Sequence, residues 1–355
     1  MDFTVPRNEL AIAVTHAAHG IPANPFHHVR AGMNILTGNE TVLFSGSDGD
    51  VTFSGRADNA NVTEEGNITV PGRLLADVVK TLPDREVRFT SDRVNCVLAC
   101  GRVNFKFPLI RDEYPDLPVR ASAIGTLDEG VFTEMVRKVL PASAKGDTNP
   151  SLATVYIESD GDTLWAVSTD KFRLAAVESG WKHDGDIKGL KGALIPAWAA
   201  DRFTKGAEGP VAIGWDENVV TLRAGNLAVI SRVMQGTFPK WRKLIPDEDC
   251  TVTVNANALR GALQRAQLAS GEQHASAELT FDSGKLHVTA GSDNYADDLM
   301  DAEHHGEPFK ALFGISMLVD GLAGCDDTAW FGWSPPHVWI QSGTYTYAFT
   351  PRRKQ

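Results

Sequence analysis

Alternating apolar and polar positions, interrupted by short amphipathic stretches, run along the whole chain and recur with a fixed period. Residues 4–14, 126–136 and 253–263 each read as a strand end that continues into an amphipathic helix. These segments start at positions 4, 126 and 253, which are 122 and 127 residues apart. The pattern therefore predicts three tandem copies of one unit.

Further landmarks repeat with nearly the same spacing. A second junction of strand and helix comes at residues 70–75, 195–198 and 315–318. A closing hairpin turns at Gly101, Gly225 and Gly343, each followed by strand-like alternation. We expect an α+β fold in which each unit has two helices on an antiparallel sheet, with domains at 1–120, 121–248 and 249–355. The predicted helices are 6–17, 71–82, 128–141, 196–205, 256–267 and 315–324.

The joints between units are also alike. Residues 113–118 and 237–242 both combine an aromatic residue with proline directly after the hairpin. Because proline and the residue before it disfavour helix, both segments are expected to be extended connectors.

Composition narrows the class of protein. The 355 residues are 43% hydrophobic and 22% charged, as in ordinary globular proteins, and the length favours more than one domain. The N-terminus has no basic region followed by an apolar run, and no stretch of eighteen apolar residues occurs, so a cytoplasmic protein without a membrane span is expected. The four cysteines are too few for a disulfide framework. A net charge of −11 argues against binding nucleic acid through a broad basic surface.

Motifs for enzymatic chemistry are missing from the sequence. There is no phosphate-binding loop, no nucleophile elbow and no zinc-binding helix motif. The pairs His27-His28 and His304-His305 would place neighbouring rings on different sides of a strand or helix, so neither pair is a ready metal site. Asp48 and Asp50 lie in a turn, where Asp is expected because its side chain bonds the nearby backbone. We therefore expect no catalytic residue, no metal and no cofactor.

Two segments carry a specific resemblance. Residues 168–175, Ser-Thr-Asp-Lys-Phe-Arg-Leu-Ala, and residues 236–246, Gly-Thr-Phe-Pro-Lys-Trp-Arg-Lys-Leu-Ile-Pro, resemble signatures of the bacterial DNA polymerase III beta subunit, the sliding clamp. The likeness extends along all three repeats, and residues 72–77 and 112–115 are most similar to actinobacterial clamps. The shorter length leaves open a copy from a phage, a plasmid or a gene duplication.

The resemblance implies a non-catalytic processivity factor of DNA replication. It implies a head-to-tail homodimer whose ring encircles duplex DNA without sequence specificity, with the helices toward the DNA and the sheets outside. DNA polymerase, clamp loader and repair proteins would bind through short linear motifs. A closed ring is held on DNA by topology, which reconciles a DNA partner with the net charge of −11.

The resemblance also implies candidate binding residues. The peptide-binding pocket would comprise Leu152, Thr169, Phe172, Arg173, Leu174, Pro239, Lys243, Leu244, Met317, Pro335, Ala348, Thr350 and Pro351. Packing between domains is the competing interpretation for Thr169, Leu174 and Pro239. The sequence departs from the family pattern at Lys171, Phe172 and Thr350, which bears on peptide specificity.

Two further sets complete the hypothesis. The DNA-facing residues would be Arg73 and Lys80, with Arg137, Lys138, Arg202, Lys205, Arg260 and Arg265, for each of which a solvated helix face is the alternative. The dimer interface would bring Phe105 and Phe107 of one subunit against Gln267, Leu268 and Glu278 of the next.

Two other classes of function compete with this hypothesis. A nuclease or phosphotransferase would use carboxylates such as Asp48, Asp170 and Asp293, but their recurrence at one position of the repeat favours a structural turn. A triplicated interaction scaffold that never meets DNA would share the repeats without forming an open-centred dimer.

Overall fold

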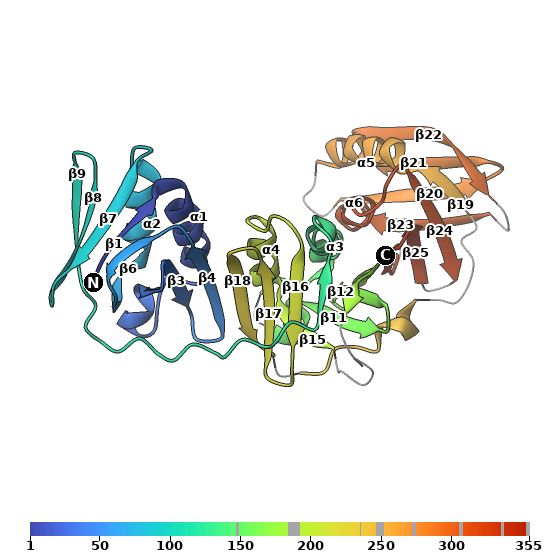
Figure 1. Ribbon diagram of the computed structural model, residues 1–355. Helices are drawn as coiled ribbons and strands as arrows, with labels where there is room; N and C mark the ends of the chain where they lie inside the picture. The colour runs from blue at the N-terminus through green and yellow to red at the C-terminus, as the bar shows by residue number, and fades with distance from the viewer. Residues whose placement is uncertain are drawn as a thin grey trace. The chain divides into compact units, whose positions relative to one another are not determined.

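The computed structural model describes residues 1–146, 149–183, 192–234, 236–245, 252–271, 275–304, 308–334 and 337–352 (Figure 1). The helices of this part are α1 (Arg7–Ala18), α2 (Gly72–Thr81), α3 (Val131–Val139), α4 (Ala197–Thr204), α5 (Ala256–Ser270) and α6 (Ile315–Leu322). All six predicted helices are present. Pro6, Pro71 and Pro196 directly precede three of them, and Asn255 caps α5 by accepting from the Ala258 amide at 2.8 Å. None of the helices described is long and apolar enough to cross a membrane.

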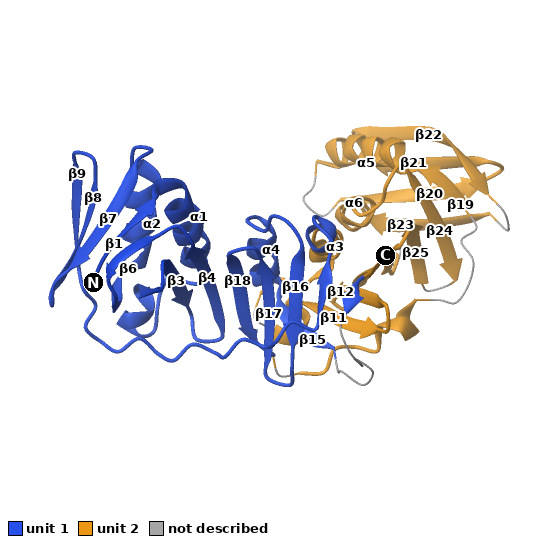
Figure 2. Ribbon diagram, in the orientation of Figure 1, with its two compact units in different colours: residues 1–133, 181–233 blue, residues 134–180, 234–355 orange. Residues whose placement is uncertain are grey.

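The chain forms two compact units, shown in different colours in Figure 2. The first contains residues 1–133 and 181–233, and the second contains residues 134–180 and 234–355. The repeats of the sequence therefore do not coincide with these compact units, because the second repeat contributes residues to both.

The strands of the first unit build two sheets. They are β1 (Asp2–Pro6), β2 (Gly32–Gly38), β3 (Thr41–Ser47), β4 (Val51–Ala57), β5 (Asn61–Glu64), β6 (Asn67–Pro71), β7 (Glu86–Ser91), β8 (Asn95–Cys100), β9 (Val103–Pro108), β10 (Gly125–Leu127), β14 (Lys182–His183), β16 (Val211–Trp215), β17 (Val219–Ala224) and β18 (Leu227–Arg232). One more strand of this unit, β15 (Ala193–Pro196), belongs to neither of these two sheets. A short 3-10 helix, η1 (His28–Ala31), precedes β2. The five-stranded sheet has the order β5-β1-β7-β8-β9, and the nine-stranded sheet has the order β14-β10-β16-β17-β18-β4-β3-β2-β6.

The nine-stranded sheet crosses the boundary between the first and second repeats. Strand β4 of the first repeat pairs antiparallel with β18 of the second, with Thr52 opposite Ile230 and Ser54 opposite Ala228. This pairing gives hydrogen-bond partners to backbone N–H and C=O groups of edge strands that each repeat would otherwise leave open. This continuity explains why part of the second repeat belongs to the first unit.

The second unit is organised in the same way. Its strands are β11 (Thr154–Asp160), β12 (Thr163–Thr169), β13 (Arg173–Gly180), β19 (Val252–Asn255), β20 (Ser276–Asp282), β21 (Lys285–Gly291), β22 (Tyr295–His304), β23 (Phe309–Gly314), β24 (Thr328–Ser334), β25 (His337–Ser342) and β26 (Tyr345–Phe349). The 3-10 helices are η2 (Leu140–Ala142), η3 (Pro150–Leu152) and η4 (Trp241–Leu244). The strands follow one another in the order β11-β12-β13-β26-β25-β24-β19-β22-β21-β20-β23. Pairing of β13 with β26 joins the second repeat to the third.

Buried side chains alternate along the strands as the sequence pattern predicts. In β8, for example, Cys96, Leu98 and Cys100 are buried, and they join the core of the first repeat with Phe3, Phe89 and residues of α1 and α2. The turns between strands are closed by aspartates: Asp48, Asp92, Asp170 and Asp216 each accept hydrogen bonds from the backbone amides two and three residues further on. The structure thus supports the structural interpretation of Asp48 and Asp170.

Candidate peptide-binding and DNA-facing sites

The turn between β12 and β13 has a fixed local geometry. Thr169 donates through its hydroxyl to the Arg173 carbonyl at 2.6 Å, while Asp170 accepts from the amides of Phe172 and Arg173 at 2.9 and 3.0 Å. Lys171 adopts a positive φ of 81°. As a result, the Phe172 side chain stands out from the turn with 64% of its surface exposed.

Arg173 ties this turn to the third repeat. Its guanidinium donates to Asp170 at 2.9 Å and to Asp320 of α6 at 2.5 Å. Burial disfavours the charged form, but Tyr347, Asp320 and Asp170 outweigh it and raise the pKa of Arg173 above its usual value. The side chain is only 11% exposed, so it is an ionic bridge inside the second unit more than a free cation.

The connector after the second repeat is anchored by its aromatic residues. Phe238 stacks on Tyr156 of β11 with centroids 4.6 Å apart, and Trp241 packs on Trp165 of β12 at 5.0 Å. These contacts hold the connector to the sheet. The prediction of an extended connector over residues 237–242 is wrong at its end, because the 3-10 helix η4 begins at Trp241. Leu244, at the end of η4, keeps 44% of its surface exposed.

The remaining candidate residues are distributed around the joint between β13 and β26. Leu174 is buried and lies opposite Ala348 in the register, and the hydroxyl of Tyr347 donates to the Met317 carbonyl at 3.0 Å. Leu152 and Thr169 are buried, Pro239, Met317 and Pro351 are half-buried, and Lys243 and Thr350 are exposed. Pro335 lies outside the described residues.

The structure therefore brings residues from both repeats together, through strand pairing and through Arg173. Asp320 completes this arrangement, and the sequence analysis did not single it out. It lies on the predicted helix 315–324 as an ordinary polar residue. No motif marks it, because its partner is 147 positions away in the chain.

Four candidate DNA-facing cations lie on helices of the first unit, and all are exposed. Arg73 donates to the Ile21 carbonyl at 3.1 Å, and Lys80 pairs with Asp77 at 3.1 Å. Arg202 donates to the His19 carbonyl at 2.9 Å and lies over the Trp198 ring, and Lys205 pairs with Asp201 at 2.7 Å. Such exposed pairs contribute little to stability and leave the charges accessible to phosphate.

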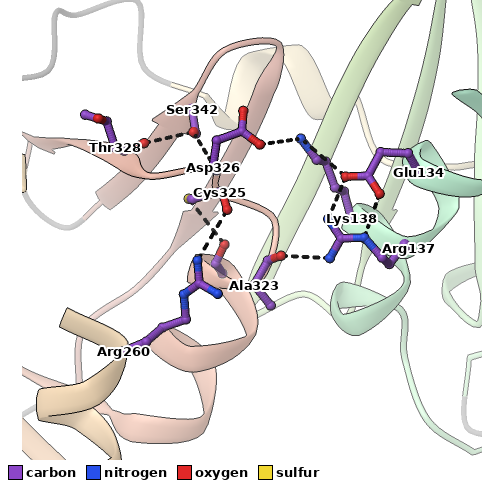
Figure 3. Close-up of polar contacts among 10 residues, drawn as sticks. Glu134, Arg137, Lys138, Arg260, Ala323, Cys325, Asp326, Thr328 and Ser342 are labelled. Atoms are coloured by element: carbon purple, nitrogen blue, oxygen red, sulfur yellow. Dashed lines mark hydrogen bonds and ion pairs between the residues drawn. The ribbon is translucent and has the colours of Figure 1, made fainter. Parts of the chain in front are cut away.

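Arg137 and Lys138 of α3 have a different environment, drawn in Figure 3. Arg137 donates to the Ala323 carbonyl at 2.9 Å while it pairs with Glu134. Lys138 is 9% exposed and lies 3.7 Å from Glu134 and 3.9 Å from Asp326. These contacts join α3 of the second repeat to the segment after α6 in the third. We call Glu134, Arg137, Lys138, Ala323 and Asp326 the α3 latch.

Two cations of α5 complete the predicted set. Arg260 is half-buried and donates to the Cys325 carbonyl at 3.5 Å (Figure 3). Arg265 is exposed and forms a bidentate pair with Asp298 of β22, with a shortest distance of 2.7 Å. Only the second of these presents its charge on the surface.

The residues predicted for the dimer interface differ in exposure. Phe107 is completely buried in the core of its own repeat. Phe105 is half-buried, with its ring centroid 4.7 Å from that of Phe107. Both lie on β9, an outermost strand of the five-stranded sheet. Leu268 is 81% exposed near the end of α5, and Gln267 is half-buried. Glu278 lies inside the second unit's sheet and pairs with Lys310.

Three family models match the chain in succession. They describe the N-terminal, central and C-terminal domains of the DNA polymerase III beta subunit and match residues 1–118, 126–240 and 242–328.

Relatives with sequence similarity include two Streptomyces proteins. The beta sliding clamp of Streptomyces coelicolor is 34% identical over 339 residues, covering 92% of this chain and 89% of that protein. The beta sliding clamp homolog GriR of Streptomyces muensis is 32% identical over 334 residues with the same coverage. The resemblance to actinobacterial clamps is thereby confirmed.

Solved structures agree on the fold. The Bacillus subtilis sliding clamp superimposes with a TM-score of 0.91 at 21% identity, and the Bartonella birtlesii clamp bound to griselimycin with 0.89 at 22% identity, each covering 100% of both chains. The chain therefore belongs to the DNA polymerase III beta subunit family, the non-catalytic sliding clamps of bacterial DNA replication.

Proposed function

We propose that this clamp closes as a head-to-tail homodimer around duplex DNA and binds the short motifs of DNA polymerase, clamp loader and repair proteins at one peptide site. The observation that carries the peptide site is the convergence of the β12–β13 turn, the connector and β26 within one unit. Each repeat would supply one of the three domains, with boundaries close to 1–120, 121–248 and 249–355.

The peptide site combines apolar and polar groups that suit an extended ligand. Pro239 and Leu244 offer apolar surface for one anchor, with Leu174 almost fully buried, and Met317 offers it for a second, with Leu152 almost fully buried. Filling each subsite with a leucine or phenylalanine side chain is worth about 1.5–3 kcal/mol before association costs are subtracted. Such a balance gives a weak complex that partners can exchange.

Leu244→Asp is the sharpest test of this site. Leu174 is 3% exposed, so its replacement by Asp would also damage the core, whereas Leu244 is 44% exposed. We expect a labelled Gln-Leu-x-Leu-Phe peptide to bind at least about tenfold more weakly by fluorescence polarisation. Val119→Asp, on the other connector and 87% exposed, is the matched control and should bind normally. Equal affinities for both variants would refute the site.

Free strand edges support closure of the ring. Among the described residues, strand β9 has a partner on one side only, and β22 pairs with β19 only through residues 302–304, which leaves the first half of β22 open on that side. Leu268, Tyr295 and Leu299 are 81%, 60% and 65% exposed near this half of β22. Pairing of β9 with β22 of the next subunit would cover both edges and these side chains.

Sedimentation tests the ring directly. Leu268→Asp together with Leu299→Asp should convert the dimer to monomers in analytical ultracentrifugation, because both side chains are exposed in the single chain and their change spares its core. Trp330→Asp, 40% exposed on β24, is the control. A dimer that survives the double change would contradict this interface, and retention of the wild-type protein on linear as well as sealed circular DNA would contradict encirclement.

A further inference from the structure

A cavity of about 480 Å³ lies on the nine-stranded sheet of the first unit, where β4 and β18 join the first two repeats. The strand register explains its shape. Ser45, Ser54, Ala228 and Arg223 lie opposite one another on successive strands, so their side chains share one face of the sheet. Small residues in the middle of this row leave the hollow, which the connector residues Leu117, Pro118 and Arg120 only partly cover.

The rim of this cavity carries three arginines. Arg56, Arg120 and Arg223 all line it, and none of its described lining residues is an aspartate or glutamate. Arg56 has a partner outside the lining, Asp58, whereas Arg223 makes no hydrogen bond or ion pair within the described residues. Burial lowers the pKa of Arg120, and the charges of Arg56 and Arg223 lower it further. The cavity therefore has an uncompensated positive charge in a protein of net charge −11.

A buried hydroxyl points to the same kind of ligand. Ser45 is 1% exposed and its Oγ has no hydrogen-bond partner among the residues that the structure describes, although the neighbouring Ser54 hydroxyl accepts from Arg120 at 3.1 Å. An unpaired buried hydroxyl is costly, and an oxygen acceptor placed in the cavity would satisfy it.

The rest of the lining restricts the occupant. Leu36, Leu43 and Ile230 supply an apolar wall that a free inorganic anion would leave bare. Among the residues that line the cavity there is no aromatic side chain on which a nucleobase could stack. The volume suits a few residues of an extended chain.

We propose that this cavity is a second docking site, which binds an acidic peptide of a protein partner. A carboxylate of the peptide lies between Arg120 and Arg223 within reach of the Ser45 hydroxyl, and a neighbouring apolar side chain packs on Leu36, Leu43 and Ile230. The site is distinct from the peptide site of the second unit, which is formed by other strands.

Fluorescence polarisation with three labelled peptides tests the chemistry on the full-length protein. The probes are Ser-Asp-Leu-Asp-Leu-Asp-Ser, its neutral form with Asn in place of Asp, and its form with Ser in place of Leu. The first should bind and the other two should bind at least about tenfold more weakly. Absence of binding by the first probe, equal binding by the neutral one, or displacement by inorganic phosphate at concentrations comparable to the peptide would each overturn the proposal.

Variants then locate the site. Arg120→Glu with Arg223→Glu should weaken binding at least about tenfold, and Arg85→Glu with Arg93→Glu, two exposed arginines of the same unit, should leave it unchanged. Gly38→Phe blocks the cavity without changing charge, because a Cβ there meets nothing within 4 Å. Circular dichroism confirms that each variant is folded. Undiminished binding by the folded Arg120→Glu, Arg223→Glu protein or by Gly38→Phe would refute the assignment.

Discussion

His16 in α1 donates a hydrogen bond from Nε2 to the carbonyl of Ala228 in β18, 3.2 Å away and 212 positions further along the chain. The ring is 3% exposed and packs against Phe53 and Phe203. It thus joins a helix of the first repeat to a strand of the second, inside one compact unit.

Burial of the His16 ring makes stability depend on pH. Burial lowers the pKa of His16 to about 4, below its value of 6.5 in an unfolded chain. Between pH 6.5 and pH 4 the unfolded state binds a proton that the folded state does not bind. The free energy of unfolding is therefore unaffected by His16 above pH 6.5. It falls by about 3 kcal/mol in total as the pH drops toward 4. Urea unfolding at several pH values should show a smaller acid loss for His16→Gln. Identical pH profiles would exclude His16 as the cause.

Lys138 in the α3 latch should tolerate loss of charge better than its reversal. Lys138→Met keeps the stem that packs in the buried site and is expected to change stability by less than about 1.5 kcal/mol, whereas Lys138→Glu places a third carboxylate beside Glu134 and Asp326 and should cost about 3 kcal/mol. Denaturant midpoints measure both. Equal effects would show that the latch is not electrostatic.

Arg173 and Asp320 should be energetically coupled. Asp320→Ala is expected to cost only about 1 kcal/mol, since Asp320 is 38% exposed and Arg173 keeps Asp170 as a partner. Arg173→Ala removes the whole bridge and should cost about 2–3 kcal/mol. In a double-mutant cycle, the variant that carries both changes should lose less stability than the sum of the losses of the two single variants. Strict additivity would mean that the observed contact contributes nothing.

Arg73 and Lys80 should matter for DNA more than the buried cation of α3. Reversing both to Glu should weaken loading onto DNA and make the remaining association less dependent on salt, because fewer phosphates are neutralised. Lys138→Met should load normally, since little of Lys138 is accessible to a phosphate. Loading assays over a salt titration would reveal whether the two classes of cation differ.

The elements of this fold were predictable because they depend on local patterns. All six helices follow from apolar periodicity and from a proline or a polar residue at their starts, as at Pro71 and Asn255. The turn of Asp170 was predictable for the same reason, since its hydrogen bonds reach only three residues ahead.

Side-chain environments that depend on distant segments were not predictable. Alternation in β9 indicates that Phe105 and Phe107 share a face, but not that one is buried and the other partly exposed. Likewise, Lys138 resembles any basic residue of an amphipathic helix until Asp326 and the Tyr345 ring are brought beside it. The division into two units also depends on pairing between strands about 175 residues apart, such as Thr52 with Ile230.

The strand pairs β4–β18 and β13–β26 bear on how such clamps can recombine. A chimera with crossover points at repeat boundaries would replace one strand of a backbone-bonded pair and keep the other, so residues from two parents would have to match in register and in packing. Crossovers between residues 133 and 134, 180 and 181, and 233 and 234 would instead take both strands of each of these two pairs from a single parent. Exchange of genetic segments between related clamps should therefore succeed more often within the second repeat than at its ends.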